Sequence, residues 1–323
     1  MSKLTVDPEL LPILSVFKEL WGDTAMDLSD LAAARQTHDA MSEQKNSLAD
    51  VVEGVETSRQ VVNDIELGLD VLVYVHKPVQ ASTVESKSSA LLHIHGGGFV
   101  TGSAAHAEPQ LRAMAKQFNC TIVSVDYRLA PEHPFPAGLF DCFAALKWVH
   151  NQASALNIDR EKIVVLGESA GGGLAAGLAL YARDHSEIKI AEQILLYPML
   201  DYRNVDLVDE QHSDTFIWSR KNNEFGWASY ISDDVDDKML AYASPSYAQD
   251  WSELPSTYVC VGDIDLFHKE SCDYVERLKA AGVSAQIDVY PGAYHAFQVV
   301  FEQAAVSQKC LQQIDAVLSK ALA

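Results

Sequence analysis

One serine lies in a pattern that can make it a nucleophile. Ser169 is the centre of Gly167-Glu168-Ser169-Ala170-Gly171, between an apolar run at 163–166 and a stretch rich in glycine and alanine. A strand, a sharp turn and a helix in this order expose the serine hydroxyl, and the helix N-terminus favours negative charge on a reacting oxygen. The pattern predicts a nucleophilic serine. The alternative is a glycine-rich turn that only packs a helix on a strand.

Three consecutive glycines follow another apolar run. Gly96, Gly97 and Gly98 come directly after residues 89–95. Glycine extends a strand poorly, so either the backbone turns where a Cβ would clash or a ligand approaches the backbone. A serine that attacks a carbonyl needs amide donors for the oxyanion, from the residue after the serine and from the loop after an upstream strand. We assign these donors to the N–H groups of Gly97, Gly98 and Ala170.

One histidine is placed where a general base could reach the serine. His295 follows the last predicted strand and the Pro291-Gly292 turn, at the carboxyl edge of the sheet. His95 precedes the nucleophile, whereas the base follows the serine in chain order in this arrangement, so His95 is expected to brace its loop. His268 is expected at the surface and His212 in a region outside the sheet. The alternative for His295 is an ordinary loop histidine.

The elements that position these residues alternate between strand and helix from residue 89 onward. Such alternation predicts an α/β fold with a mostly parallel sheet, helices on both faces and ligands at the carboxyl ends of the strands. Residues 52–78 alternate apolar and polar side chains and add two strands of a hairpin, which makes eight strands. The other predicted strands are 89–95, 120–126, 162–166, 192–197, 256–261 and 285–290, and helices are predicted near 108–118, 137–150, 169–183, 267–281 and 303–322.

Two segments stand outside this alternation. Residues 1–50 contain two helical stretches, one capped by Asp7 and one over about 29–41. Residues 199–244 are acidic and aromatic, with a helix near 219–232. We predict that the two segments form a helical cap over a catalytic core made of 51–198 and 245–323. The "DDVDD" cluster in the second segment lacks the spacing and glycine of a calcium loop and is expected to be solvated.

The composition excludes several classes of protein. The chain has 323 residues, 48% of them hydrophobic, and a formal net charge of −21. This charge argues against nucleic-acid binding and against docking on anionic membranes. The N-terminus lacks the pattern of a signal peptide, and the weakly polar run at 170–182 is too short to span a bilayer. Five cysteines without a CxxC pair fit a reducing compartment, so we predict a cytoplasmic protein without membrane insertion.

The chain resembles the hormone-sensitive-lipase-like esterases (bacterial family IV) of the α/β-hydrolase fold. The matching motifs occur in family order and cover most of the chain beyond residue 60. The resemblance implies a capped esterase with a Ser-Asp-His triad, no metal and no organic cofactor. The motifs are "HGGGF" at 95–99, "DYRLAPEHPFPA" at 126–137, "GESAGGGLA" at 167–175, "LLYPMLD" at 195–201, "LPSTYVCVGDID" at 254–265 and "YHAF" at 294–297.

The resemblance identifies Asp265 as the acid of the triad, with Asp263 on the same loop as the alternative. Residues 265–270 read Asp-Leu-Phe-His-Lys-Glu where the family usually has Asp-Pro-Leu-Arg-Asp-Glu, and Glu168 replaces the usual Asp or Thr. Arg128 in the second motif could bind a substrate carboxylate, but the prolines around it favour a rigid loop that braces the glycine run.

These residues together predict two-step acyl transfer. Ser169 would attack an ester carbonyl while His295 takes its proton, and Asp265 would hold the imidazole. The resemblance, together with the predicted cap, implies the activity of a serine carboxylesterase on small short- to medium-chain acyl esters. The alternatives are an amidase, deacetylase or lactonase of the same fold, or a non-catalytic receptor. Four aromatic residues could line an apolar pocket or form the core of the cap: Phe17, Trp21, Phe216 and Trp218. The last strand and the helix at 303–322 could pair two subunits in a homodimer.

Overall fold

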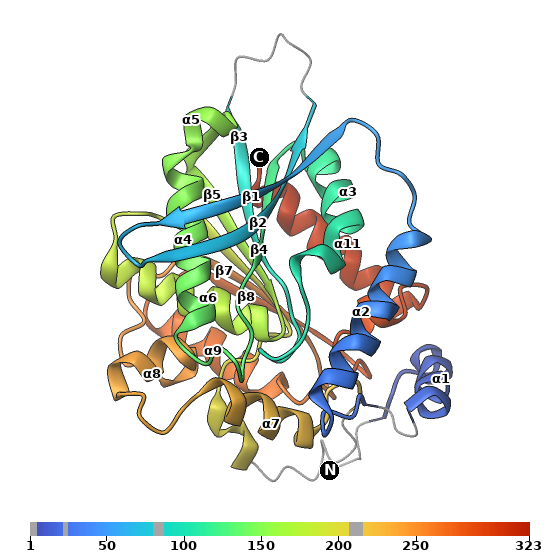
Figure 1. Cartoon of the computed structure of the whole chain (residues 1–323). Helices are drawn as coiled ribbons and strands as arrows, with labels where there is room; N and C mark the ends of the chain where they lie inside the picture. The colour runs from blue at the N-terminus through green and yellow to red at the C-terminus, as the bar shows by residue number, and fades with distance from the viewer. Residues whose placement is uncertain (1–4, 22–24, 80–86, 207–215) are drawn as a thin grey trace.

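One sheet organises the molecule (Figure 1). The computed structural model describes residues 5–21, 25–79, 87–206 and 216–323, with the backbone alone at 20, 21 and 206. Within these residues eight strands pair in the order β1-β2-β4-β3-β5-β6-β7-β8. The strands are β1 Val55–Asp64, β2 Leu69–Pro78, β3 Ser88–Ile94, β4 Thr121–Asp126, β5 Ile158–Glu168, β6 Glu192–Leu196, β7 Ser256–Gly262 and β8 Ala285–Tyr290.

The pairing confirms the predicted sheet. β1 and β2 form an antiparallel hairpin, β2 pairs antiparallel with β4, and the remaining pairs are parallel. Along β3 the side chains alternate between the two faces, so that Leu92 and Leu91 belong to different buried clusters. Both faces are therefore covered, as expected for a parallel sheet.

Helices cover the sheet from both sides (Figure 1). Apolar residues of α4 (Ala137–Asn151), α6 (Ala170–His185) and α9 (His268–Ala280) fill the cluster on one face. Apolar residues of α3 (Glu108–Phe118) and α11 (Ala305–Ala321) fill the other. The short α5 (Ala153–Leu156) and α10 (Phe297–Val300) lie in connections. Among the described helices none is both long and apolar enough to cross a membrane.

The strand order reverses around β3, and this reversal brings the two glycine-rich motifs together. β3 pairs with β4 on one side and with β5 on the other, so the chain leaves β3 and β5 at adjacent points of one edge. Ile94 at the end of β3 is in register with Gly167 at the end of β5. Such a reversal point is where open α/β sheets bind ligands.

Two segments outside the sheet hold the remaining α-helices. The N-terminal segment holds η1 (Pro8–Leu10), α1 (Leu11–Trp21) and α2 (Leu31–Ser47). The second segment holds η3 (Tyr202–Asp206), α7 (Arg220–Tyr230) and α8 (Asp237–Ala243), and η5 (Pro245–Tyr247) follows. A β-bridge joins Ala25 to Ile217, and α8 packs against α6. The two segments therefore meet at the bridge between Ala25 and Ile217, and the division into cap and core stays a prediction.

One helix is longer than its sequence pattern predicted. The apolar periodicity around α2 ends at Met41, but the helix continues to Ser47. The added turn contains Glu43, Gln44 and Lys45, which favour helix without needing a buried face. The periodicity thus marked the packed part of the helix and missed the solvated part.

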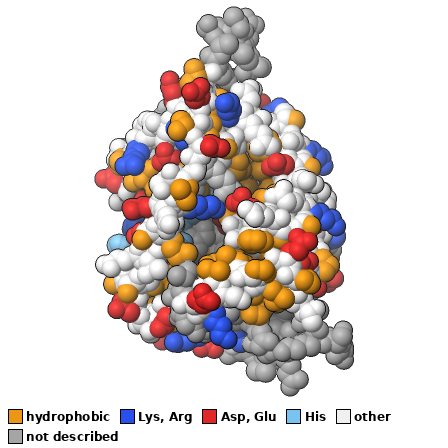
Figure 2. All heavy atoms as spheres, turned by 90° about the vertical axis from the view of Figure 1, so that its right-hand side faces the viewer, with side chains coloured by type: hydrophobic (Ala, Val, Ile, Leu, Met, Phe, Trp, Pro, Cys, Tyr) orange, Lys and Arg blue, Asp and Glu red, His pale blue; other side chains and the backbone are white. Residues whose placement is uncertain are grey.

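The face that carries α1 and α2 is turned to the viewer in Figure 2. Acidic side chains are scattered over this face and interspersed with lysine and arginine. Leu11 and Val16 of α1 are nearly half exposed. Among the described side chains of this face the acidic groups are therefore spread out and form no single patch.

Candidate active site

The turn between β5 and α6 holds Ser169 in an unusual backbone conformation. Its φ is 54° and its ψ −119°, a region that favours glycine. A Cβ on Gly167 would lie 2.2 Å from the Gly171 carbonyl oxygen, and a Cβ on Gly171 would lie 2.2 Å from that of Ile94. The flanking glycines are therefore required by close backbone packing, which gives a physical reason for the sequence pattern.

Ser169, His295 and Asp265 form one hydrogen-bonded chain. The Ser169 Oγ lies 2.9 Å from His295 Nε2, and His295 Nδ1 lies 2.9 Å from Asp265 Oδ2. The other carboxylate oxygen of Asp265 accepts a hydrogen bond from the amide of Phe267 at 2.9 Å. All three side chains are buried. Hydrogen bonds at both ring nitrogens set the tautomer and orientation of the imidazole.

The structure separates the two candidate acids. Asp263 Oδ1 accepts a hydrogen bond from the amide of Gly292 at 2.7 Å, so this carboxylate holds the turn before His295. Asp265 contacts the imidazole itself. His268 is half-buried at the start of α9, where a surface position was expected, and His212 lies outside the described residues.

The glycine run after β3 lies directly against the serine. A Cβ on Gly96 would lie 3.3 Å from the Ser169 Cβ. The Gly97 carbonyl accepts hydrogen bonds from the amides of Val100 and Thr101, which closes a tight turn. Gly97 and Gly98 have φ values of 122° and 61°. In the described part of the chain no acceptor takes a hydrogen bond from the amides of Gly97, Gly98 or Ala170.

His95 braces the glycine run, as predicted. Its Nδ1 lies 2.8 Å from the Gly96 carbonyl oxygen, and its ring stacks on Tyr127 at 4.2 Å between centroids. The Tyr127 hydroxyl donates to the His95 carbonyl at 2.9 Å. Burial lowers the pKa of His95 to about 3, so the ring is neutral at pH 7. These contacts hold the loop that carries the glycine run.

Residues of the motif at 126–137 brace the segment around the glycine run. Arg128 makes a two-pronged contact with the Asp141 carboxylate, with nitrogen–oxygen distances of 2.9 and 2.7 Å. Asp126 accepts the amide of Ala104 at 2.9 Å. Because the Arg128 guanidinium is held by Asp141, the contacts favour a structural brace over the binding of a substrate carboxylate.

An arginine that the sequence analysis missed ties α2 to the glycine run. Arg35 Nε donates to the Val100 carbonyl at 2.7 Å, and its guanidinium pairs with Glu132 at 2.8 Å. The residue lies on a helix far upstream, so no local pattern connects it with the site. Its position on the polar face of a cap helix was the only available signal.

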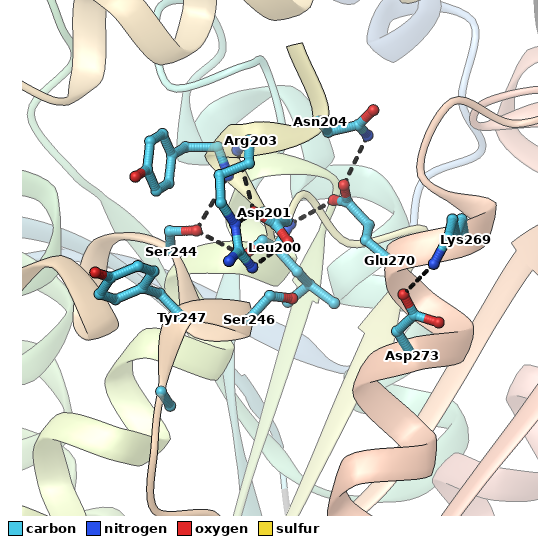
Figure 3. A network of polar contacts seen from close by, with 12 residues as sticks. Leu200, Asp201, Arg203, Asn204, Ser244, Ser246, Tyr247, Lys269, Glu270 and Asp273 are labelled. Atoms are coloured by element: carbon cyan, nitrogen blue, oxygen red, sulfur yellow. Dashed lines mark hydrogen bonds and ion pairs between the residues drawn. The ribbon is translucent and has the colours of Figure 1, made fainter. Parts of the chain in front are cut away.

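The buried carboxylate of Glu270 connects the region that follows Asp265 to the segment after β6 (Figure 3). Glu270, five residues after Asp265, accepts the Leu200 amide and the Asn204 side-chain amide, both at 2.7 Å. Burial raises the pKa of Glu270 well above its ordinary value. Asn204 also donates to the Leu266 carbonyl at 3.1 Å. A signal was present in the sequence: an acidic residue stands on the apolar stripe of the 267–281 helix.

The four predicted pocket residues fall in different places. Phe17 is buried and belongs to the apolar cluster on the α3 and α11 side of the sheet, which favours the core interpretation for this residue. Trp218 packs so closely that a Cβ on Gly98 would lie 1.9 Å from its indole ring. Phe216 is half-buried with its ring 6.0 Å from that of Tyr294, the neighbour of His295. The side chain of Trp21 lies outside the described part.

Two described cavities lie away from the triad. One of about 460 Å³ lies between α6 and α8 and is lined by Arg183, Tyr242 and Asp250 among others. The other, of about 230 Å³, lies between α3 and α11, where Glu168 contributes to the wall. Burial raises the pKa of this carboxyl. Glu168 thus lines a cavity on the α3 and α11 side, which none of the triad residues lines.

Known proteins are similar to this chain in sequence. A family model described as alpha/beta hydrolase fold matches residues 91–299. An arylesterase of Saccharolobus solfataricus is 31% identical over 229 residues, which cover 70% of this chain and 72% of that protein. The carboxylesterase NlhH of Mycobacterium tuberculosis is 34% identical over 232 residues, 71% of each chain.

Solved structures agree over nearly the whole chain. The structure of a protein named bacterial heroin esterase superposes with a TM-score of 0.89 at 33% identity, covering 99% of this chain and 98% of that one. An esterase of Mycobacterium marinum, LipW, gives a TM-score of 0.83 at 29% identity, covering 99% and 96%. The chain therefore belongs to the alpha/beta hydrolase fold family, in agreement with its resemblance to the hormone-sensitive-lipase-like esterases.

Proposed function

We propose that Ser169, His295 and Asp265 are the catalytic triad with which this chain hydrolyses carboxylic esters. The observation that carries the proposal is the buried hydrogen-bonded chain from the Ser169 Oγ through His295 to Asp265. Its relatives include proteins named arylesterase, carboxylesterase and ester hydrolase, which supports a carboxylesterase.

The reaction follows from this geometry in two steps. The Ser169 oxygen forms a bond to the acyl carbon while His295 Nε2 takes the hydroxyl proton, and the carbonyl oxygen becomes negative. The amides of Gly97, Gly98 and Ala170 stabilise that oxygen. The bond to the alcohol then breaks as His295 returns the proton to it, which leaves an acyl-enzyme. Water repeats the sequence and releases the acid.

Asp265 stabilises the imidazolium that forms between these steps. It accepts a hydrogen bond from the Nδ1–H group of His295 and so keeps Nε2 directed at the serine, while the Nδ1 proton stays on the imidazole. Its second oxygen is held by the Phe267 amide, so the carboxylate cannot rotate freely.

The acyl group is proposed to be short to medium in length. Trp218 and Phe216 stand beside the glycine run and the His295 loop, where they would limit the space for the acyl chain. An amidase, deacetylase or lactonase would use the same groups, and substrate tests distinguish them. The cytoplasmic location remains a prediction, as does a homodimer through the edge strand β8 and α11, which light scattering would test.

The first test is hydrolysis of p-nitrophenyl esters from acetyl to palmitoyl. Wild type should hydrolyse the esters with short acyl chains fastest. Ser169→Ala should lose on the order of 10⁴-fold or more in kcat. Asp265→Asn should lose about 10⁴-fold because the imidazole takes the wrong tautomer. Asp263→Asn is the matched control and should keep most of the activity. Equal losses in the two aspartate variants would contradict the assignment of the acid.

A phosphonate probe tests the acyl-enzyme separately. It should add one covalent group per chain, located on Ser169 by peptide mass spectrometry, and none in Ser169→Ala. Esterase activity without labelling of Ser169 would contradict the acyl-enzyme mechanism. No activity on any ester, with labelling intact, would direct the search to amides and lactones.

A further inference from the structure

A second cluster of reactive side chains lies where α2 meets η2 (Ala104–Ala107), away from the triad. His38 and Asp39 are neighbours on α2, and His106 belongs to η2. His106 Nε2 lies 3.0 Å from Asp39 Oδ1, and the two imidazole rings meet edge to face at 4.9 Å between centroids. One potential ligand atom from each of the three residues lies within 4.8 Å of the other two.

The two imidazoles are incompletely paired within the described residues. The Nδ1 atom of His38 is buried and makes no hydrogen bond there, whereas His106 contacts Asp39 through its Nε2 atom. Burial, with His106 nearby, lowers the pKa of His38 to about 4. Buried polar atoms are normally paired. A buried imidazole nitrogen without a partner, next to a second imidazole and a carboxylate, is therefore unusual.

The donor set matches one class of ion. Neutral imidazole and carboxylate are ligands of zinc and of similar divalent transition metals, with metal–nitrogen distances of about 2.0–2.1 Å and metal–oxygen distances of about 2.0–2.2 Å. Two such ligands on one tetrahedral ion stand about 3.4 Å apart, so the His106–Asp39 separation of 3.0 Å needs only a small rotation to admit an ion. Three protein ligands leave a position for water.

We propose that His38, Asp39 and His106 bind a divalent transition-metal ion of the zinc class that fastens α2 to η2. The ion takes no part in ester hydrolysis. η2 begins six residues after Gly98, and Arg35, one helical turn before Asp39, already donates to the Val100 carbonyl. An ion at this place would add a second attachment between α2 and the segment that follows the glycine run.

Calorimetric titration of the full chain with zinc chloride tests the site, after treatment with a chelator and its removal. We expect one zinc ion per chain in wild type. His106→Gln, His38→Gln and Asp39→Asn should each weaken binding at least tenfold. Asp39 is more than half exposed, so its variant is expected to fold normally. The matched control is His150→Gln on α4, which should bind zinc as wild type does.

Cobalt supplies a readout that does not depend on activity. Two imidazoles and a carboxylate should give visible cobalt absorption bands in wild type and in His150→Gln, and these bands should be absent from Asp39→Asn. A zinc-induced rise in the unfolding temperature should follow the same pattern. The proposal is overturned if wild type shows no saturable zinc binding. It is also overturned if the three cluster variants retain wild-type affinity, since the ion would then bind elsewhere, for example at His295 or Cys272.

Discussion

Two runs of three glycines meet beside Ser169, and they serve different physical purposes. Gly96 to Gly98 follow β3, with positive φ at Gly97 and Gly98 and amides that no described acceptor uses. Gly171 to Gly173 begin α6 with helical backbone, where a Cβ would collide with the backbone of β3 or of residues 198 and 199. Close contact occurs in both runs, since a Cβ on Gly97 would lie 2.1 Å from the Thr101 carbonyl oxygen. The first run differs from the second in its positive φ values and its open donors. An identical triplet in the sequence therefore has no single structural meaning.

The largest expected effect concerns the second run. In Gly171→Ala the new methyl would lie 2.2 and 2.3 Å from the carbonyl oxygens of Ile94 and His95, neither of which can move without displacing β3. The free energy of unfolding should fall by about 3 kcal/mol, measured by chemical denaturation. The control is Gly282→Ala, which meets nothing within 4 Å and should lose only about 1 kcal/mol through its positive φ. Equal losses in the two variants would show that close contact does not explain the second run.

A substitution in the first run should lower activity more than stability. In Gly98→Ala the methyl would lie 1.9 Å from the Trp218 ring, which is the far end of a side chain and can move. We expect kcat/KM to fall about 10²-fold on a short ester while the free energy of unfolding changes by about 1 kcal/mol.

A double-mutant cycle sharpens this expectation. If the loss in Gly98→Ala comes from the displaced indole, adding Trp218→Ala should recover part of the activity. The coupling energy should then lie between about 0.5 and 3 kcal/mol. Strict additivity of the two substitutions would place the loss in the glycine backbone alone.

The strand before the first glycine run, β3, carries a buried histidine. A substitution of this histidine should change how the free energy of unfolding depends on pH. Burial lowers the pKa of His93 from 6.5 to about 3, even though the Glu168 carboxylate lies 4.0 Å away. Below pH 6.5 the unfolded chain binds a proton that the folded chain does not, so stability decreases as the pH falls. One such group contributes about 1.4 kcal/mol per pH unit. His93→Gln should therefore flatten the stability profile between pH 6.5 and 5.5 by about 1 kcal/mol, measured by denaturation at each pH. An unchanged profile would mean that His93 is protonated in the folded state.

The smallest effect on stability is expected for the ion pair between Arg35 and Glu132, which supports the first run. The hydrogen bond from Arg35 lowers the pKa of Glu132 to about 2, and this contribution is present above the ordinary pKa and lost as the pH falls towards 2. The Glu132 side chain is 55% exposed, so water and salt screen the pair. Glu132→Gln should reduce stability by less than about 1 kcal/mol at low salt and by still less at high salt. A loss as large as that of Gly171→Ala would show that the support is essential.

The sequence predicted which residues the structure brings together at the proposed site, because local motifs carry them. The strand before Ser169, the turn before His295 and the glycine run each show their role within a few residues. The attachments of Arg35 and Glu270 join segments far apart in the chain, so their partners appear only after folding. Aromatic composition also failed to separate Phe17, which is buried in the apolar cluster on the α3 and α11 side, from Trp218, which packs against Gly98. Periodicity gave the buried length of α2 but could not show its solvated last turn.

The backbone angles of Ser169 have a consequence for how far this chain can be stabilised. A φ of 54° with a ψ of −119° costs a non-glycine residue about 1–3 kcal/mol. A Ser169→Gly variant would lose the hydroxyl and relax the strain, so it should be inactive yet more stable than wild type. The protein is thus less stable than its fold permits, because activity requires a serine at this position. A measurable part of the lost free energy of unfolding comes from the φ and ψ angles of this one residue.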